Sequence, residues 1–327
     1  MSRLFVNPHR RIDQVPPPPS GDEILRFHRS LPGYEPTPVW EALGALVKDE
    51  SSRLGLPAFK ILGASWAVER TLRERPEVNT LVAASAGNHG RAVARAAAWR
   101  GLRCRIFLPA RASHARVEAI ASEGAEVVRL DGDYEDAVAA AGEAGTEPGT
   151  ANVADVSYDP GDPRGGWAIE GYSTLFRELA GVEFDLLLVP IGVGSLAAAA
   201  VSFAAHLELP VPVVGVEPVS AACVTASLEA GEPVTIDAPG TTMAGLDCAR
   251  PSAVAWPLLR DGLHATVTVS DDELAGPMRL LAGLGHQIGE CGAAPLAALE
   301  ACAELGGGSL AIATEGVTDP GSYHRVV

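Results

Sequence analysis

Lys60 is the residue of this sequence with the clearest capacity for covalent chemistry. It lies between an apolar flank, Leu56–Phe59, and a small-residue segment, Ile61–Ser65, that is typical of the start of a helix. Burial in such surroundings lowers the pKa of a lysine, and the free amine can then attack a carbonyl group. We predict a nucleophilic amine here. The alternative is a surface lysine whose aliphatic stem covers apolar atoms.

A glycine-rich turn could bind phosphate. It follows the apolar segment Asp185–Val189 and precedes an alanine-rich stretch with helical spacing. Glycines allow backbone N–H groups to point inward, and the N-terminus of a helix adds partial positive charge. The alternative is a tight strand-to-helix turn without a ligand, because the turn is shorter than a full dinucleotide fingerprint. The candidate phosphate-binding residues are Gly192, Val193, Gly194, Ser195 and Leu196.

Two more polar segments follow predicted strands. The first, Ser85-Ala86-Gly87-Asn88-His89, also precedes a helical pattern, so its amides could bind an anion. A structural alternative is that Ser85 or Asn88 caps its own helix. The second segment begins with Thr314, directly after the last predicted strand, where a turn or cap role is the alternative. His89 taken alone is more typical of a structural hydrogen-bonding histidine than of a proton carrier.

In their order along the chain and with their separations, the four segments (Lys60, Ser85–His89, Gly192–Leu196 and Thr314) resemble the fold-type II pyridoxal-phosphate enzymes, the group of threonine dehydratase and the tryptophan synthase β chain. Within this group the sequence is similar above all to the diaminopropionate ammonia-lyases. The resemblance extends from about residue 34 almost to the C-terminus. The phrases that carry it are Lys48-Asp49-Glu50-Ser51, Ala58-Phe59-Lys60, Gly87-Asn88-His89-Gly90-Arg91, Met243-Ala244-Gly245-Leu246 and Thr314-Glu315-Gly316-Val317-Thr318-Asp319.

The resemblance implies roles for the candidate residues. Lys60 would bind pyridoxal 5'-phosphate covalently and act as the general base. The Gly192–Leu196 turn would hold the phosphate, Asn88 would lie beside the ring hydroxyl, and the hydroxyl of Thr314 would face the pyridine nitrogen. Asp155 matches a further carboxylate of the family, which could be a base or could bind a distal amino group; a solvated loop aspartate is the alternative. The implied substrate-carboxylate loop contains Ser85, Ala86, Asn88 and His89.

One residue departs from the family pattern. Diaminopropionate ammonia-lyases that use both stereoisomers carry an aspartate immediately before the glycine of the asparagine loop, where this chain has Ala86. An alanine cannot take a proton from the face opposite Lys60. The loop Ser85–His89 is therefore also similar to that of an L-threonine or L-serine dehydratase.

The resemblance implies α,β-elimination of a small amino acid, with 2,3-diaminopropionate as the first candidate and pyruvate and ammonia as products. The first alternative is an L-threonine or L-serine dehydratase, or a β-replacement enzyme of the same fold. The second alternative belongs to another class of protein, a pyridoxal-phosphate-binding protein without turnover, for which Ala86 is the one indication.

The elements that must position these residues alternate between strand and helix, which predicts mainly parallel sheets covered on both faces. The resemblance implies the two-lobed, three-layer α/β fold of the tryptophan synthase β type, with 1–76 and 165–327 in a large domain and 77–164 in a small inserted domain. The predicted strands are Leu46–Glu50, Thr80–Ala84, Arg103–Leu108, Glu126–Leu130, Asp185–Val189, Val211–Glu217, Ala265–Val269 and Ser309–Ala313. The predicted helices are Asp22–Ser30, Gly90–Trp99, Ser113–Ser122, Tyr134–Ala141, Trp167–Leu179, Leu196–Leu207 and Ala293–Glu304.

Composition excludes several classes of protein. The 327 residues carry 41 acidic and 25 basic side chains, a formal charge of -16, which disfavours nucleic acid and anionic membranes as partners. Five scattered cysteines favour a reducing cytoplasm, and no histidine spacing indicates a metal site. Pro190 and two glycines interrupt the long uncharged run 186–205, which disfavours a membrane span. Residues 1–21 are predicted to form an extended arm, and the resemblance implies a homodimer.

Overall fold

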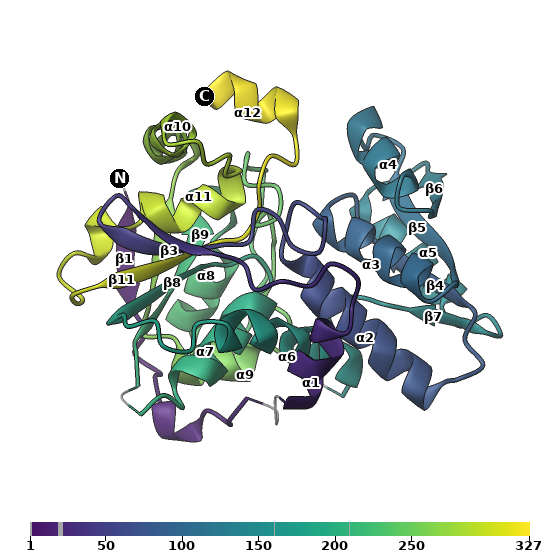
Figure 1. The fold of residues 1–327 in the computed structure, drawn as a ribbon, viewed down its shortest axis with the longest axis horizontal. Helices are drawn as coiled ribbons and strands as arrows, with labels where there is room; N and C mark the ends of the chain where they lie inside the picture. The colour runs from purple at the N-terminus through teal and green to yellow at the C-terminus, as the bar shows by residue number, and fades with distance from the viewer. Residues whose placement is uncertain (1, 19–21, 160, 209) are drawn as a thin grey trace.

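The computed structural model describes residues 2–18, 22–159, 161–208 and 210–327, and two sheets organise them (Figure 1). The large sheet has the strand order β1-β10-β9-β8-β11-β3-β2, and the small sheet has the order β6-β5-β4-β7. Neighbouring strands are parallel except for the outer strands β1 and β2, which are antiparallel to their neighbours. The strands are β1 (Arg3–Val6), β2 (Val39–Ala42), β3 (Ala45–Asp49), β4 (Thr80–Ala84), β5 (Arg103–Pro109), β6 (Glu126–Leu130), β7 (Thr150–Asn152), β8 (Leu186–Pro190), β9 (Val213–Pro218), β10 (Ala265–Val269) and β11 (Ser309–Ala313).

Helices cover both sheets, as the alternating pattern predicts. Helix α2 packs against α6 and α3, so it lies between elements of the two sheets (Figure 1). The α-helices are α1 (Asp22–Arg29), α2 (Lys60–Glu74), α3 (Asn88–Trp99), α4 (His114–Ala121), α5 (Tyr134–Ala144), α6 (Pro163–Arg177), α7 (Ser195–Ala204), α8 (Cys223–Ala230), α9 (Trp256–Gly262), α10 (Ala275–Gly283), α11 (Glu290–Ala297) and α12 (Pro320–Val326). Short 3-10 helices are η1 (Ile12–Gln14), η2 (Val219–Ala221), η3 (Asp271–Leu274) and η4 (Glu300–Cys302).

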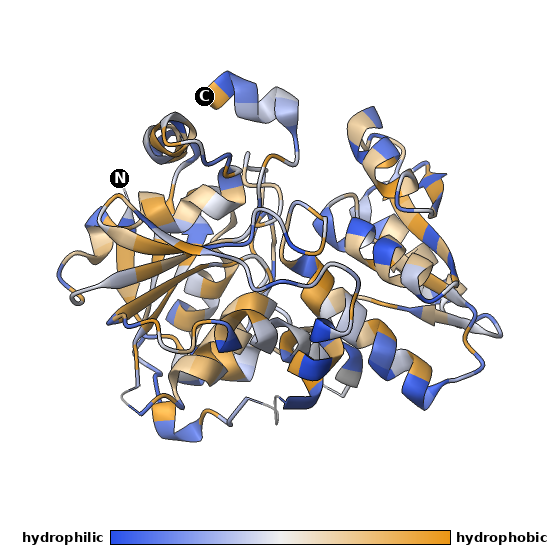
Figure 2. Cartoon of the chain, in the orientation of Figure 1, coloured by the Kyte–Doolittle hydropathy of each residue, from blue (hydrophilic) through white to orange (hydrophobic). Residues whose placement is uncertain are grey.

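The central strands of the large sheet form the core. All residues of β8 and β9 are buried, which explains their nearly unbroken apolar sequences. Figure 2 shows apolar residues concentrated along these strands. The long uncharged run 186–205 divides into β8, a glycine turn and α7, and no helix in the described part of the chain is long and apolar enough to cross a membrane.

The prediction of an extended surface arm for residues 1–21 is wrong at its beginning. Residues Arg3–Val6 form β1 and pair antiparallel with β10, from Arg3 opposite Thr268 to Val6 opposite Ala265. A strand of four residues is too short for its alternation to be recognised in a sequence. Pro19, the last proline of the predicted arm, lies outside the described residues, as does Pro160 in the predicted domain boundary.

Most other predicted elements are confirmed, and the deviations have physical causes. The segment after α5, for which no strand was predicted, leads into β7, whose residues pair parallel with β4. Helix α11 spans Glu290–Ala297 instead of Ala293–Glu304; Pro295 lies inside it, and the 3-10 helix η4 follows. Helix α6 begins at Pro163 because Asp162 caps it, its side chain accepting a hydrogen bond from the backbone N–H of Arg164.

Candidate active site

Lys60 is the first residue of α2, and its side chain is 20% exposed. Its Nζ donates a hydrogen bond to Oδ2 of Asp155 at 2.7 Å. The same nitrogen lies 5.3 Å from the ring centroid of Phe59 and 5.9 Å from that of Tyr172. The amine therefore occupies a partly buried position with one carboxylate partner and two aromatic neighbours.

The environment of Lys60 corrects the predicted direction of its pKa. Burial is the largest single contribution and lowers this pKa, as predicted, but the charge and hydrogen bond of Asp155, together with the neighbouring Tyr172 and Cys248, raise the pKa of Lys60 above its ordinary value. For Asp155 the effects are reversed: burial by itself would raise its pKa, but His89 and Lys60 together hold the pKa of Asp155 below its ordinary value. Lys60 is therefore an ammonium group in this ion pair and must lose a proton before it can act as a nucleophile.

The chain contains only one other lysine, Lys48, and the structure separates the two clearly. The side chain of Lys48 is fully buried, and its Nζ contacts the backbone oxygen of Thr37 at 2.7 Å and Oε2 of Glu178 at 2.6 Å. Of the two lysine side chains, that of Lys60 is the one whose amine is accessible to an additional group. The sequence shows that there are two lysines, but only the structure shows which of them is enclosed.

Asp155 brings three predicted site segments together from the linker between β7 and α6. Besides Lys60, its Oδ2 lies 3.7 Å from Nδ1 of His89, and its backbone oxygen accepts a hydrogen bond of 3.1 Å from Oγ of Ser195. His89 is held from its other side, where Nε2 lies 2.8 Å from the backbone oxygen of Val153. The alternative of a solvated loop aspartate is therefore wrong, because Asp155 lies among functional groups.

The glycine turn between β8 and α7 is closely packed. Gly194 has a φ of +98°, and a Cβ atom there would lie 2.4 Å from Cδ1 of Leu259. A Cβ atom on Gly192 would lie 2.8 Å from the backbone oxygen of Gly245 and 3.0 Å from Sγ of Cys248. The first N–H groups of α7 have no acceptor within the helix, so they are available to an anion. The turn can therefore form a phosphate cradle that needs glycine at both positions.

The asparagine loop lies against the end of β11. Asn88 is the first residue of α3, and its Nδ2 donates a hydrogen bond to Oε2 of Glu315 at 2.6 Å. The N-cap residue of α3 is Gly87, which makes no side-chain cap, and its backbone N–H donates to Oγ of Ser85 at 3.3 Å. The alternative in which Ser85 or Asn88 caps this helix is therefore not what the structure shows. Thr314 is buried, and its backbone oxygen accepts a hydrogen bond from Phe59 N–H at 3.3 Å.

Sequence reasoning gave no role to Tyr172 or Glu315. The ring of Tyr172 is fully buried at 4.8 Å from that of Phe59, and its hydroxyl has no hydrogen-bond partner among the described residues. A Cβ atom on Gly63 would lie 2.5 Å from this ring. The small residue three positions after Lys60 was a weak signal for a bulky neighbour, but nothing in the sequence indicated which residue would occupy the space.

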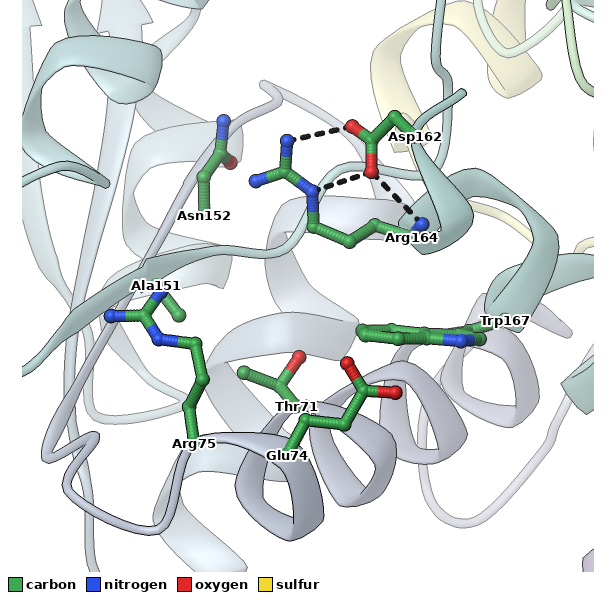
Figure 3. Close-up of a pocket in the computed structure, with 8 residues that line it drawn as sticks. All are labelled: Thr71, Glu74, Arg75, Ala151, Asn152, Asp162, Arg164 and Trp167. Atoms are coloured by element: carbon green, nitrogen blue, oxygen red, sulfur yellow. Dashed lines mark hydrogen bonds and ion pairs between the residues drawn. The ribbon is translucent and has the colours of Figure 1, made fainter. Parts of the chain in front are cut away.

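A separate cavity of about 250 Å³ lies between the end of α2, β7 and the start of α6 (Figure 3). Asp162 and Arg164 lie on one side of it and bond to each other, and the ring of Trp167 lies on another. None of the predicted site residues lines this cavity. We therefore place the chemistry at Lys60 and not at this cavity.

Comparison with known proteins identifies the family. Residues 31–315 match the family model of the pyridoxal-phosphate dependent enzymes. The chain belongs to this family. Its amine at Lys60 and the glycine cradle next to Asp155 fit the aldehyde and the phosphate of pyridoxal phosphate, and the cofactor of this enzyme is pyridoxal phosphate.

Relatives of known activity cover most of the chain. The diaminopropionate ammonia-lyase of Salmonella typhimurium LT2 is 33% identical over 80% of this chain and 75% of the relative, and that of Escherichia coli K12 is 30% identical over 92% and 89%. The biosynthetic L-threonine dehydratase of Escherichia coli K12 is 30% identical over 80% of this chain and 52% of the relative.

Solved structures agree with this classification. The Escherichia coli diaminopropionate ammonia-lyase in complex with an aminoacrylate-PLP azomethine reaction intermediate has a TM-score of 0.90 and 29% identity, with 100% of this chain and 97% of that chain covered. Its complex with D-serine has a TM-score of 0.91 and 27% identity at the same coverage. The threonine deaminase of tomato, Solanum lycopersicum, at 23% identity and a TM-score of 0.83 over 99% of this chain and 96% of that chain, shows the same fold. The predicted two-lobed α/β fold of the fold-type II enzymes is confirmed.

Proposed function

We propose that this pyridoxal-phosphate enzyme is an ammonia-lyase that catalyses α,β-elimination of 2,3-diaminopropionate to pyruvate and ammonia. The observation that carries the proposal is the 2.7 Å contact between Lys60 and Asp155, which places an amine and a carboxylate together at one end of α2. Two relatives named for this activity, 33% and 30% identical to the chain, support the same substrate.

Lys60 carries the covalent and acid-base chemistry in this proposal. Bound pyridoxal phosphate supplies an electron sink for the bonds broken at the substrate Cα. Lys60 anchors the cofactor, and its released amine removes the Cα proton once it is neutral. Because Asp155 raises the pKa of the free amine, the departure of Lys60 from this ion pair favours proton loss. The carboxylate of Asp155 is then available to bind the distal ammonium group of a diamino acid or to act as a second base.

We assign binding roles to the remaining predicted residues. The glycine turn binds the cofactor phosphate, because its N–H groups lie at the start of α7 and its glycines admit a close approach. Asn88 and Thr314 would hold the pyridine ring of the bound cofactor. The loop at the start of α3 binds the substrate carboxylate. The residues of the phosphate turn are Gly192, Val193, Gly194, Ser195 and Leu196, and those of the carboxylate loop are Ser85, Ala86, Asn88 and His89.

Ala86 indicates the stereoisomer. A methyl group accepts no proton, so this position offers no base on the face opposite Lys60, and we propose that the L-isomer is the substrate. Incubation of the purified protein with L- and D-diaminopropionate, L-serine and L-threonine, with assays for 2-oxo acid and ammonia, tests this. We expect pyruvate from L-diaminopropionate alone. Pyruvate from the D-isomer would contradict the role given to Ala86.

A dehydratase is the second candidate, and the loop Ser85–His89 favours it because the loop lacks a carboxylate. In that case L-serine or L-threonine gives the 2-oxo acid and L-diaminopropionate does not. Absence of product from all four compounds would instead support a protein that binds pyridoxal phosphate without turnover. A relative that supports the dehydratase alternative is the L-threonine dehydratase of Escherichia coli, about half of whose length this chain covers.

We also propose how the chain is divided and where it works. The small sheet contains only strands between Thr80 and Asn152, which supports a small domain at 77–164 inserted into a large domain made of 1–76 and 165–327. A homodimer and a cytoplasmic location complete the proposal. The family resemblance supports the first, and five free cysteines support the second.

A further inference from the structure

Glu315 is a buried carboxylic acid at the junction of three segments. It lies two residues after the last residue of β11 and is 5% exposed. Its backbone forms an isolated antiparallel bridge with Ala58, two residues before Lys60, and its backbone oxygen accepts a hydrogen bond from Gly289 N–H at 3.0 Å. The backbone of Glu315 is thus fixed against the segment that carries Lys60 and against the start of α11.

The carboxyl group of Glu315 connects this junction to the other sheet. Its Oε2 accepts the 2.6 Å hydrogen bond from Nδ2 of Asn88, and its Oε1 accepts a bond of 3.4 Å from the backbone N–H of Cys291. Asn88 begins α3, which packs on the small sheet, whereas Glu315 follows a strand of the large sheet (Figure 1). A single side-chain contact therefore joins two segments that are 227 residues apart in the sequence.

The chemistry of the two groups determines the orientation of the amide. A carboxylate only accepts hydrogen bonds, so it selects the rotamer of Asn88 that presents Nδ2 and not Oδ1. Bonds to an ionised acceptor are shorter and stronger than neutral ones, in agreement with the 2.6 Å distance. With one N–H used, the plane of the amide is fixed, and its second N–H and its oxygen point in defined directions.

Retaining this carboxyl group carries an energetic cost. Burial raises the pKa of Glu315, the bonds from Cys291 and Asn88 lower it, and the nearby carboxyl group of Glu290 raises it further. Glu290 is itself buried, and its Oε1 has no hydrogen-bond partner among the described residues. A purely structural role at this position could be filled by an uncharged side chain at lower cost, which indicates that the acceptor is needed for Asn88.

We propose that Glu315 is a positioning residue, which orients the side-chain amide of Asn88 toward bound pyridoxal phosphate and holds the start of α3 against the Lys60 segment. The inference rests on the placement of Asn88 in the cofactor site proposed above, and not on the identity of the substrate. Glu315 acts on the cofactor through Asn88, so removing Asn88 must abolish the effect of removing Glu315.

A double-mutant cycle tests this dependence. The variants are Glu315→Ala, Asn88→Ala and the double variant, with Glu300→Ala as a control at an exposed glutamate. The readout is the dissociation constant of pyridoxal phosphate, measured by absorbance as the cofactor is titrated into stripped protein. We expect binding to weaken about tenfold in Glu315→Ala, the equivalent of one lost hydrogen bond to a charged group, and less than about twofold when the same change is made on the Asn88→Ala background.

Additional measurements keep the result interpretable. Glu315→Gln retains an acceptor oxygen and is expected to recover most of the lost affinity. Glu315→Leu, which has no acceptor, replaces Glu315→Ala in the cycle if that variant does not fold. Equal losses of affinity on both backgrounds, or a change of less than about twofold in Glu315→Ala, would overturn the proposal. Activity on diaminopropionate is not part of the readout, so failure of the proposed substrate leaves this test unaffected.

Discussion

At the scale of single residues, the reactivity of Lys60 depends on its partner more than on its burial. Partial burial alone would favour a neutral amine, yet Asp155 at 2.7 Å reverses the direction of the pKa shift. Desolvation is the largest single contribution, and the charge of Asp155 reverses its effect only together with the hydrogen bond to Asp155 and the neighbouring Tyr172 and Cys248. The covalent chemistry of this enzyme must therefore begin with the separation of this ion pair.

Lys60 should be the single covalent attachment point of the cofactor. Reduction of the holoenzyme with borohydride, followed by proteolysis and mass spectrometry, should place the cofactor on the peptide that contains Lys60. Lys48 is an internal control, since it is the only other lysine and its amine is enclosed by Thr37 and Glu178. Lys60→Ala should lose the visible absorption of the cofactor. Label on the Lys48 peptide would remove Lys60 from the chemistry.

His28 should make the protein sensitive to acid. It is fully buried, with Nε2 3.0 Å from the backbone oxygen of Leu62 and Nδ1 2.7 Å from Oγ1 of Thr174. Burial lowers the pKa of His28 to about 3. The folded pKa is below the ordinary value of 6.5, so the neutral ring contributes its full stability above pH 6.5 and loses it as the pH falls toward 3.

The test compares wild type with His28→Phe in urea unfolding between pH 8 and pH 5. The stability advantage of the wild type should shrink by about 2 kcal/mol between pH 8 and pH 5, most of it below pH 6.5, since one differential proton gives about 1.4 kcal/mol per pH unit. A constant difference between the two proteins over this range would show that His28 is not the responsible group.

At the scale of elements, the connection from β8 to α7 shows how a turn becomes a binding site. The buried strand ends at Pro190, and α7 begins five residues later at Ser195. In between, Gly192 and Gly194 pack so closely against Gly245 and Leu259 that a Cβ atom on either glycine would clash with them. The close packing fixes the direction of the N–H groups at the start of α7, which is the requirement for binding a phosphate without further rearrangement.

Gly194→Ala should therefore weaken cofactor binding by more than about tenfold. The added Cβ atom meets Leu259 at 2.4 Å, and the φ of +98° is unfavourable for alanine. Gly181→Ala is the matched control, because Gly181 also has a positive φ, of +84°, but has open space around its Cα. Titration of pyridoxal phosphate into both stripped proteins compares them. Equal affinity losses would mean that backbone strain, and not the cradle, explains the effect.

At the scale of the whole molecule, a buried ion-pair network holds in place the chain segment that precedes Lys60. Glu178 at the end of α6 contacts Nζ of Lys48 on β3 at 2.6 Å and Nη1 of Arg53 at 2.7 Å. Arg53 also pairs with Glu50, and these side chains are at most 3% exposed. The network joins β3 and the loop that follows it toward Lys60 to the end of α6, which is more than 100 residues away in the sequence.

Glu178→Gln should destabilise the protein by about 3–5 kcal/mol, because it leaves the buried Lys48 without a counter-charge and removes one of the two carboxylates that pair with Arg53. Glu74→Gln is the control, since Glu74 pairs with Arg70 in a side-chain pair that is largely exposed, and it should change the free energy of unfolding by less than about 1 kcal/mol. Urea unfolding at neutral pH provides both values. A similar, small effect of both substitutions would contradict the structural role of the network.

Local patterns in the sequence were sufficient for the fold class and for the segments of the site. The strands Thr80–Ala84, Glu126–Leu130, Ala265–Val269 and Ser309–Ala313 have the predicted bounds. Three of them are almost wholly buried, and buried parallel strands need short runs rich in apolar and β-branched residues. Glu126–Leu130 is an edge strand without a buried residue. Short edge elements escaped prediction. β1 has four residues and β7 has three, and each pairs with a strand that is distant in the sequence.

The amino-acid sequence by itself determined that Lys60, the glycine turn and the asparagine loop each follow or precede a regular element, since this depends on neighbours in the chain. Only the tertiary structure decided which of these groups meet. The ion pair of Lys60 with Asp155 spans 95 residues and the bond of Asn88 to Glu315 spans 227. Electrostatic shifts depend on distances in space, so the protonation state of the amine could not be obtained from a pattern of residue types along the chain.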